Sequence, residues 1–257
     1  MQNTQSLKRL SRMKRVIAPI VAVVTLGLVP MSYAQVVIGA GSTWSGGNAI
    51  IDWGCDDVTV NGTLDIQAAT TANADSVLIN GSGVLNGGSG TLGLTGDFTN
   101  MGVFNKNTGK IAITDGCANL SSTIAGSQNF AALSVTTSTG KQLNFTAGST
   151  TTVSPGQLTL AGAAGNLLTI RSTTPGSPAF IHLTGTQNIH HVDVADNTAT
   201  SLQLAPGVPS LSNSVNSGNV LNWFDVMLRV PTLSGFGLMF LVLGLAVVAA
   251  QRRKARL

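Results

Sequence analysis

The sequence contains no glutamate, and all ten of its acidic residues are aspartate. Charged residues make up only 9% of the 257 positions, against about 25% in ordinary globular domains. Because glutamate, lysine and arginine fill the solvent-facing positions of helices, their scarcity argues against a helical protein. The polar residues are instead mostly Thr, Ser, Asn and Gly, which suit short strands separated by tight turns.

Basic residues are scarce outside the two ends of the chain. Ten of the 14 Lys and Arg lie within residues 8–15 and 229–256, and only four lie within residues 35–226. All ten aspartates lie in that central part, which therefore carries a net charge of −6 although the whole chain carries +4. This part has no basic patch interleaved with aromatic side chains, so we expect no nucleic-acid partner.

The first 34 residues have the order of a secretory signal peptide. A basic stretch precedes an apolar run, residues 16–29, and small residues precede a predicted cleavage between Ala34 and Gln35. The apolar run is shorter than the about 20 residues that a membrane-spanning helix requires, which favours cleavage over an uncleaved anchor. We therefore expect export, with the secretion translocon and signal peptidase as partners.

The carboxyl end combines a short motif, an apolar segment and a basic stop. Residues 230–250 carry no charge and are long enough to cross a bilayer. The basic residues that follow should stay in the cytoplasm, which places the central part of the chain outside the inner membrane. The segments are a motif at 230–233, a transmembrane helix at 234–250 and a basic end at 251–257 with Arg252, Arg253, Lys254 and Arg256.

This tail resembles the IPTL-CTERM sorting domain of Gram-negative bacteria. The Ile-Pro-Thr-Leu signature of that family is matched by Val230, Pro231, Thr232 and Leu233, and the resemblance covers only residues 230–257. Valine in place of isoleucine keeps a β-branched aliphatic side chain. The resemblance implies cleavage near the motif by an exosortase, a membrane-embedded protease-transpeptidase, and release from the inner membrane to the cell surface or beyond. The alternative is a plain single-pass anchor.

Between the two ends, pairs of apolar residues at positions i and i+2 recur, flanked by Gly, Ser, Thr or Asn. Such alternation indicates strands with one buried face and one wet face. The pairs are Val58/Val60, Leu64/Ile66, Val77/Ile79, Leu92/Leu94, Ile111/Ile113, Leu133/Val135, Leu143/Phe145, Leu158/Leu160, Leu168/Ile170, Ile181/Leu183, Val192/Val194 and Leu202/Leu204.

The spacing of these pairs fits either a right-handed parallel β-helix (a solenoid) or a β-sandwich. Short strands and scarce aromatics favour the solenoid, because each turn buries small apolar side chains against the next turn. A sandwich would need longer strands and large core aromatics. We predict an all-β solenoid over residues 35–197, similar to the β-helical passengers of bacterial surface proteins, and a Ser/Asn/Pro-rich spacer over 198–229.

Only two cysteines, Cys55 and Cys117, are present, and both lie in the exported part. In an oxidising compartment an isolated pair most simply forms a disulfide. A catalytic thiol would need a nearby histidine, and all three histidines lie after residue 180.

His182, His191 and Asp193 form the cluster that most resembles a reactive site. Their aliphatic neighbours occupy the buried face, so on adjacent strands these three side chains would meet as a weak metal site. The alternative is polar residues on a wet sheet surface, because the sequence does not fix the strand register. The aspartates near Cys55 (Asp52, Asp56 and Asp57) lack the spacing of a calcium loop. We therefore predict no metal, no other cofactor and no catalytic residue.

These observations favour a structural or adhesive protein of the cell surface or extracellular matrix, with an extracellular polysaccharide as partner. Rows of Thr, Ser and Asn offer hydrogen bonds to sugars without strong charge. The alternative is a β-helical polysaccharide lyase or hydrolase. A lyase needs a basic residue to abstract a proton and a hydrolase needs paired acids, whereas the four basic residues here are scattered and no acid pair stands out.

Overall fold

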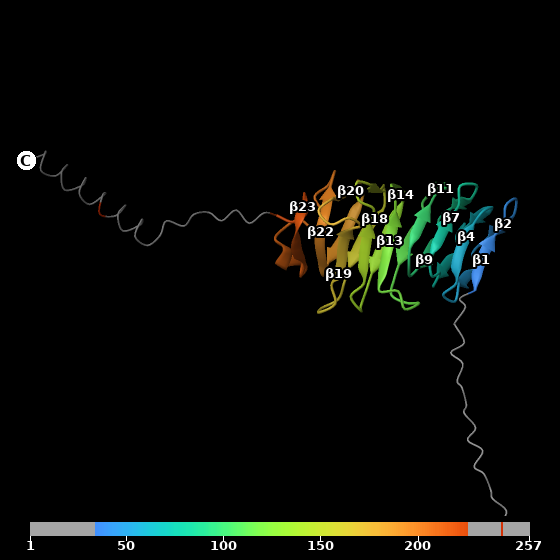
Figure 1. The fold of residues 1–257 in the computed structure, drawn as a ribbon, viewed down its shortest axis with the longest axis horizontal. Coiled ribbons are helices and arrows are strands. Elements are labelled where there is room, and N and C mark those ends of the chain that lie inside the picture. The colour runs from blue at the N-terminus through green and yellow to red at the C-terminus, as the bar shows by residue number, and fades with distance from the viewer. Residues whose placement is uncertain (1–33, 226–242, 244–257) are drawn as a thin grey trace, which may run out of the picture. The chain divides into compact units, whose positions relative to one another are not determined.

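The structure is a computed structural model that describes residues 34–225 and Leu243. Residues 34–225 form a parallel β-solenoid in which three short strands make one turn (Figure 1). Most strands pair in parallel with the equivalent strand of the next turn, for example β1 (Gln35–Ile38) with β4 (Asp57–Val60). The predicted solenoid is confirmed, and the β-sandwich alternative is wrong because a sandwich is built from antiparallel sheets.

The strands form three faces that run along the stack. The first face contains β1, β4, β7 (Val77–Ile79), β10 (Phe98–Asn100), β13 (Ser121–Ala125), β16 (Gln142–Phe145), β19 (Leu168–Ser172), β22 (Val192–Ala199) and β23 (Val215–Leu221). The second contains β2 (Thr43–Ser45), β5 (Thr63–Asp65), β8 (Val84–Asn86), β11 (Val103–Asn105), β14 (Gln128–Phe130), β17 (Thr150–Val153) and β20 (Ala179–Leu183). The third contains β3 (Ile50–Asp52), β6 (Thr70–Ala72), β9 (Thr91–Leu94), β12 (Lys110–Ile113), β15 (Ala132–Thr136), β18 (Gln157–Ala161) and β21 (Thr186–His190).

The second face is interrupted between β11 and β14. The ladder β2–β5–β8–β11 ends at β11, whereas β14, β17 and β20 continue through β22 into the ladder of the first face. At the interruption the rings of Phe98, Phe104 and Phe130 pack together, with centroids 5.4–5.8 Å apart. Apolar packing between aromatic rings thus joins the turns where the strand ladder of the second face does not.

The core lies inside the stack and follows the predicted alternation. Both members of every predicted pair from Val58/Val60 to Val192/Val194 are buried, whereas Leu202 of the last pair is 46% exposed. Each buried Val, Leu or Ile contributes about 1.5–3 kcal/mol relative to an exposed one, so repeated small side chains suffice for a core.

Glycine is frequent because successive turns approach closely at one corner. Gly62, Gly83 and Gly102 occupy this corner in successive turns, between the first and second faces. A Cβ at Gly83 would lie 2.1 Å from the carbonyl oxygen of Val60 in the preceding turn. No side chain fits there without moving the backbone.

The solenoid extends past its predicted end at residue 197. β23 pairs in parallel with β22, and Trp223 and Phe224 are buried beneath this last turn. Residues 198–225, predicted to be a spacer, are therefore part of the fold, and Pro209 only begins the short helix η1 (Pro209–Ser212). Composition did not reveal this turn because β23 lies at the end of the stack, is mostly exposed and lacks the alternation of an inner strand.

Within the part of the chain that the structure describes, no helix is long and apolar enough to cross a bilayer. The predicted signal peptide up to Tyr33 and the predicted tail at 230–257, apart from Leu243, lie outside the described residues.

Candidate functional site

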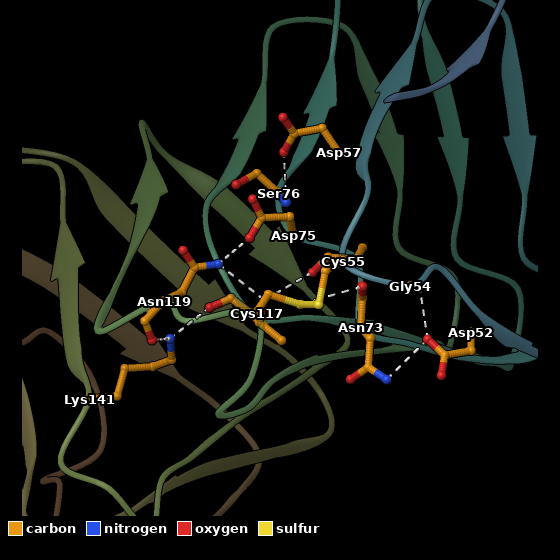
Figure 2. The surroundings of a disulfide bond; sticks show 12 residues. Asp52, Gly54, Cys55, Asp57, Asn73, Asp75, Ser76, Cys117, Asn119 and Lys141 are labelled. Carbon is orange, nitrogen blue, oxygen red and sulfur yellow. Dashed lines mark hydrogen bonds between the residues drawn. A yellow bond between two sulfur atoms is a disulfide. The ribbon is translucent and has the colours of Figure 1, made fainter. Parts of the chain in front are cut away.

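The predicted disulfide between Cys55 and Cys117 is confirmed (Figure 2). Cys55 follows β3 in the first turn and Cys117 follows β12 in the fourth, with their Cα atoms 5.3 Å apart. The two can meet because residues 114–120, which we term the back-folded loop, lie over the corner between the third and first faces. In this loop the Cys117 sulfur lies 3.8 Å from the Asn73 carbonyl oxygen of the second turn.

The carboxylates near the disulfide accept hydrogen bonds that connect turns at the same corner. Asp52 Oδ1 accepts hydrogen bonds from the Gly54 amide at 2.9 Å and from Asn73 Nδ2 at 3.0 Å, and these donors lower the pKa of Asp52. Asn119 of the back-folded loop donates to Asp75 and, at 3.1 Å, to Thr95 Oγ1 (Figure 2). These side chains join the first four turns to one another.

Lys141 is buried at this corner and binds the back-folded loop. It is only 1% exposed, and its Nζ donates to the carbonyl oxygens of Thr95 and Asn119, each at 2.7 Å. Burial lowers the pKa of Lys141, against the opposing attraction of three nearby aspartates, namely Asp115, Asp97 and Asp75. The sequence alone gave no sign of this role, because the partners of Lys141 lie in other turns.

The structure does not bring His182, His191 and Asp193 together. The His182 ring bonds Thr200 Oγ1 at 3.2 Å, and His191, whose φ is 53°, lies against His190 with their Nδ1 atoms 3.0 Å apart. The left-handed residue turns the chain just before β22, so the simple alternation on which the prediction depended does not continue through it. Among the described residues, no three His, Cys, Asp or Glu side chains converge as a metal ion would require.

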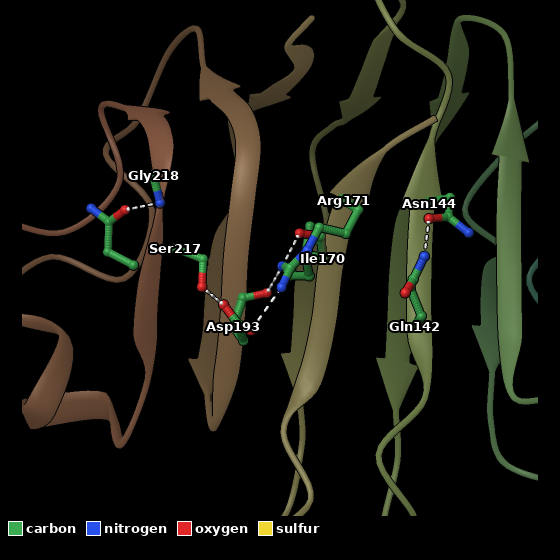
Figure 3. A network of polar contacts seen from close by, with 8 residues as sticks. Gln142, Asn144, Ile170, Arg171, Asp193, Ser217 and Gly218 are labelled. Carbon is green, nitrogen blue, oxygen red and sulfur yellow. Dashed lines mark hydrogen bonds and ion pairs between the residues drawn. The ribbon is translucent and has the colours of Figure 1, made fainter. Parts of the chain in front are cut away.

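Asp193 instead pairs with Arg171 on the first face (Figure 3). Arg171 Nη2 lies 2.7 Å from Asp193 Oδ2, and its Nη1 donates to the carbonyl oxygens of Ile170 and Asp193 at 2.8 and 2.7 Å. Ser217 of β23 donates to the other carboxylate oxygen of Asp193. The cluster thereby joins β19, β22 and β23, so Arg171 is a link between the last turns.

A cavity of about 640 Å³ lies on the second face, over β5, β8 and β11. We term it the β5–β8–β11 cavity. The strand register aligns Asp65, Asn86 and Asn105 in one outward column, with one residue from each of three successive turns. The cavity is lined by Asp65, Gln67, Asn86, Gly88, Phe104, Asn105, Lys106 and Asn107.

The polar groups of this column are only partly used by the protein. Asn105 Nδ2 donates to Asn86 Oδ1 at 2.9 Å, and Asp65 accepts two bonds from Gln67 that are both 3.3 Å long. Within residues 34–225, the remaining side-chain atoms of this pair, Asn86 Nδ2 and Asn105 Oδ1, make no hydrogen bond. The cavity therefore presents a donor, an acceptor and a carboxylate with lone pairs to spare.

Lys106 and Phe104 border the cavity beside the interruption of the second face. Lys106 Nζ donates to Asn129 Oδ1 at 2.8 Å and to the Ser154 carbonyl oxygen at 2.6 Å, so its charge is held by later turns. Phe104 points inward but is only half-buried, because β11 has no strand paired on its far side. Phe104 is among the residues that line the cavity.

The column of Asp65, Asn86 and Asn105 was not predicted from the sequence. The available signal is the recurrence of Asp65, Asn86 and Asn105 at intervals of about one solenoid turn, 21 and then 19 residues. That interval has meaning only once the register is known.

Comparison with protein-family models, curated proteins and solved structures finds no match. A parallel β-solenoid does not by itself say what the protein does.

Proposed function

We propose that this is an exported structural or adhesive protein of the cell surface or extracellular matrix, whose solenoid binds an extracellular polysaccharide. The observation that carries the proposal is the regular outward array of uncharged hydrogen-bonding side chains on a stiff stack of strands. Two amide pairs illustrate it, since Asn80 donates to Asn61 at 2.5 Å and Asn105 donates to Asn86 at 2.9 Å. Such arrays match the hydroxyl groups of a glycan without the cost of stripping water from many charges.

Export is supported by where the fold begins and by the disulfide. The predicted signal-peptidase site between Ala34 and Gln35 lies directly before the first residue of β1, so cleavage there keeps all of β1 in the mature protein. Gln35 also contributes to the fold, because its Nε2 donates to Thr59 Oγ1 at 2.9 Å. The Cys55–Cys117 bond suits an oxidising compartment outside the cytoplasm.

For the carboxyl end we propose sorting by an exosortase at Val230–Leu233. The motif begins at Val230, after the last residue of the described solenoid, Asp225. In this proposal the protein is held in the inner membrane until it is processed, and then reaches the cell surface or the medium. We also infer a right-handed winding, because connections between parallel strands of one sheet are nearly always right-handed.

The non-enzymatic role is supported by the state of the basic side chains. Of the four basic side chains within residues 35–225, Lys106, Lys141 and Arg171 each donate to backbone carbonyl groups and Lys141 is buried, whereas Lys110 is exposed on β12. A lyase needs a basic group that is free to take a proton from its substrate. No specific contact favours the lyase or hydrolase alternative.

Mass spectrometry of both termini of the protein from its producing cells tests the export proposal. We expect an amino terminus at Gln35 and the loss of Arg256 and Leu257. An intact carboxyl end in cells that contain the sorting enzyme would overturn the processing step. Shortening of acidic or neutral polysaccharides by the purified protein, lost on substitution of Arg171, would overturn the non-enzymatic role.

A further inference from the structure

We propose that the β5–β8–β11 cavity is a subsite for a neutral hexose unit of a polysaccharide. The proposal rests on the proposed adhesive function and adds to it a place on the molecule and a class of sugar. The volume of about 640 Å³ is within the range of about 300–1,000 Å³ that small-molecule sites occupy.

The hydrogen-bonding groups of the cavity suit neighbouring hydroxyl groups of a hexose. The Asp65 carboxylate can accept two O–H donors, because its existing bonds from Gln67 are long at 3.3 Å. The Asn86 Nδ2 can donate to a hydroxyl oxygen and the Asn105 Oδ1 can accept from a hydroxyl. The Asn86–Asn105 bond of 2.9 Å fixes the orientation of both amides, so little rotational freedom is lost when a sugar binds.

An apolar surface completes the site. A hexose has apolar C–H groups as well as hydroxyls, and the half-buried Phe104, which lines the cavity, is the aromatic residue available to contact them. Phe104 is held in place by Phe98 and Phe130, whose ring centroids lie 5.5 and 5.8 Å from its own. This aromatic contact borders the cavity beside the polar column.

The charges select a neutral sugar over an acidic one. A uronate carboxylate in this cavity would face Asp65, and the two like charges would repel each other. Lys106 also lines the cavity and keeps its positive charge, but two of its Nζ hydrogens are directed to Asn129 and the Ser154 carbonyl of later turns rather than to the column. The central part of the chain also carries a net charge of −6, which lowers the encounter rate with polyanions.

The test measures binding of the mature exported protein to three neutral polymers (dextran, mannan and galactan) and to the polyuronate alginate. We expect at least one neutral polymer to bind, and Asp65→Ala and Asn105→Ala each to weaken that binding about tenfold or more. Matched controls are Asp56→Ala and Asn188→Ala. Asp56 lies beside the disulfide, Asn188 is exposed on β21, and neither lines the cavity, so both should stay within about twofold of the wild type.

Each outcome has a distinct meaning. Neutral-polymer binding that both cavity variants retain would overturn the subsite and leave the adhesive function standing. Preferential binding of alginate would overturn the class of sugar. Binding of none of the four polymers would overturn both the subsite and the polysaccharide partner. If Asp65→Ala does not fold, Asp65→Asn replaces it, because this variant keeps the side-chain volume and should still weaken binding by removing the charge.

Discussion

In the first four turns, β1–β12, every strand has three or four residues, whereas most strands of β13–β23 have five to eight. Shorter strands give fewer ladder hydrogen bonds between successive turns. The disulfide and the back-folded loop join the first four turns at one corner, and Lys141, which precedes β16, binds this loop. The last turns are joined by side-chain contacts alone, such as the partly exposed Arg171–Asp193 cluster and the bond from Trp223 Nε1 to Asn197 Oδ1. The covalent bond thus lies where the strand ladders are shortest.

The largest expected effect is at the boundary between the two regions. Phe98→Ala removes the ring that contacts both Phe104 and Phe130, so it should lower the free energy of unfolding by about 3–5 kcal/mol. Denaturant unfolding measures this loss, with Ile113→Val as a control that should cost about 0.5–1.5 kcal/mol. A loss for Phe98→Ala no larger than that of the control would show that the boundary does not depend on the aromatic cluster.

Removing the disulfide should weaken the first region selectively. The double variant Cys55→Ser and Cys117→Ser should lose about 2–4 kcal/mol, because the bond closes a loop between residues 62 positions apart. Hydrogen exchange should show faster exchange in β1–β12 and little change in β18–β23. A reductant should affect the wild type and leave the double variant unchanged. Equal loss of protection in both regions would contradict the comparison.

Lys141→Met should cost about 1–3 kcal/mol at neutral pH, because the carbonyl groups of Thr95 and Asn119 lose a buried donor. Burial lowers the pKa of Lys141, so between its folded pKa and the ordinary lysine value of about 10.4 the unfolded chain binds more protons than the folded chain. Wild-type stability therefore gains from rising pH in that interval, and the variant lacks this gain. Unfolding curves from neutral pH to about pH 10 should show that the difference in free energy of unfolding between the wild type and the variant widens. A difference that narrows would contradict the burial of this ammonium group.

The smallest effect is expected in the last turns. Arg171→Gln breaks an ion pair whose side chains are 25% and 21% exposed, so it should cost about 1 kcal/mol or less. The cost should fall further at about 1 M salt, because screening already weakens a partly exposed pair. Denaturant unfolding at two salt concentrations measures this. A loss as large as that from removing the disulfide would show that the last turns depend on this ion pair as much as the first turns depend on the disulfide.

The two regions also differ in how well the sequence predicted them. Strands with inward residues at both ends, such as Val77–Ile79, show an i/i+2 pair and were predicted. In β3 and β8 only the middle residue, Ile51 or Leu85, points inward, so no pair is visible. Such strands are concentrated in the early turns, and they escaped prediction.

Predicting the candidate site would have required more than the positions of the strands. The column of Asp65, Asn86 and Asn105 depends on the register of three turns, which is set by the exact length of each connecting corner. Lys141 meets Thr95 and Asn119 only because the back-folded loop returns over earlier turns. Contacts between distant turns of this kind leave no local pattern in the sequence.

The disulfide has a mechanical consequence. Ladder hydrogen bonds between successive turns point along the stack, and the described chain enters at β1 and leaves at β23, at opposite ends (Figure 1). Tension between these two ends pulls along the bonds, so the strands peel away one turn at a time. When peeling reaches Cys55, the force passes through the covalent bond directly to Cys117. The residues between them, which include those that line the β5–β8–β11 cavity, then bear no tension, although the contacts of Phe104 with Phe130 and of Lys106 with Asn129 and Ser154 are lost as the later turns extend.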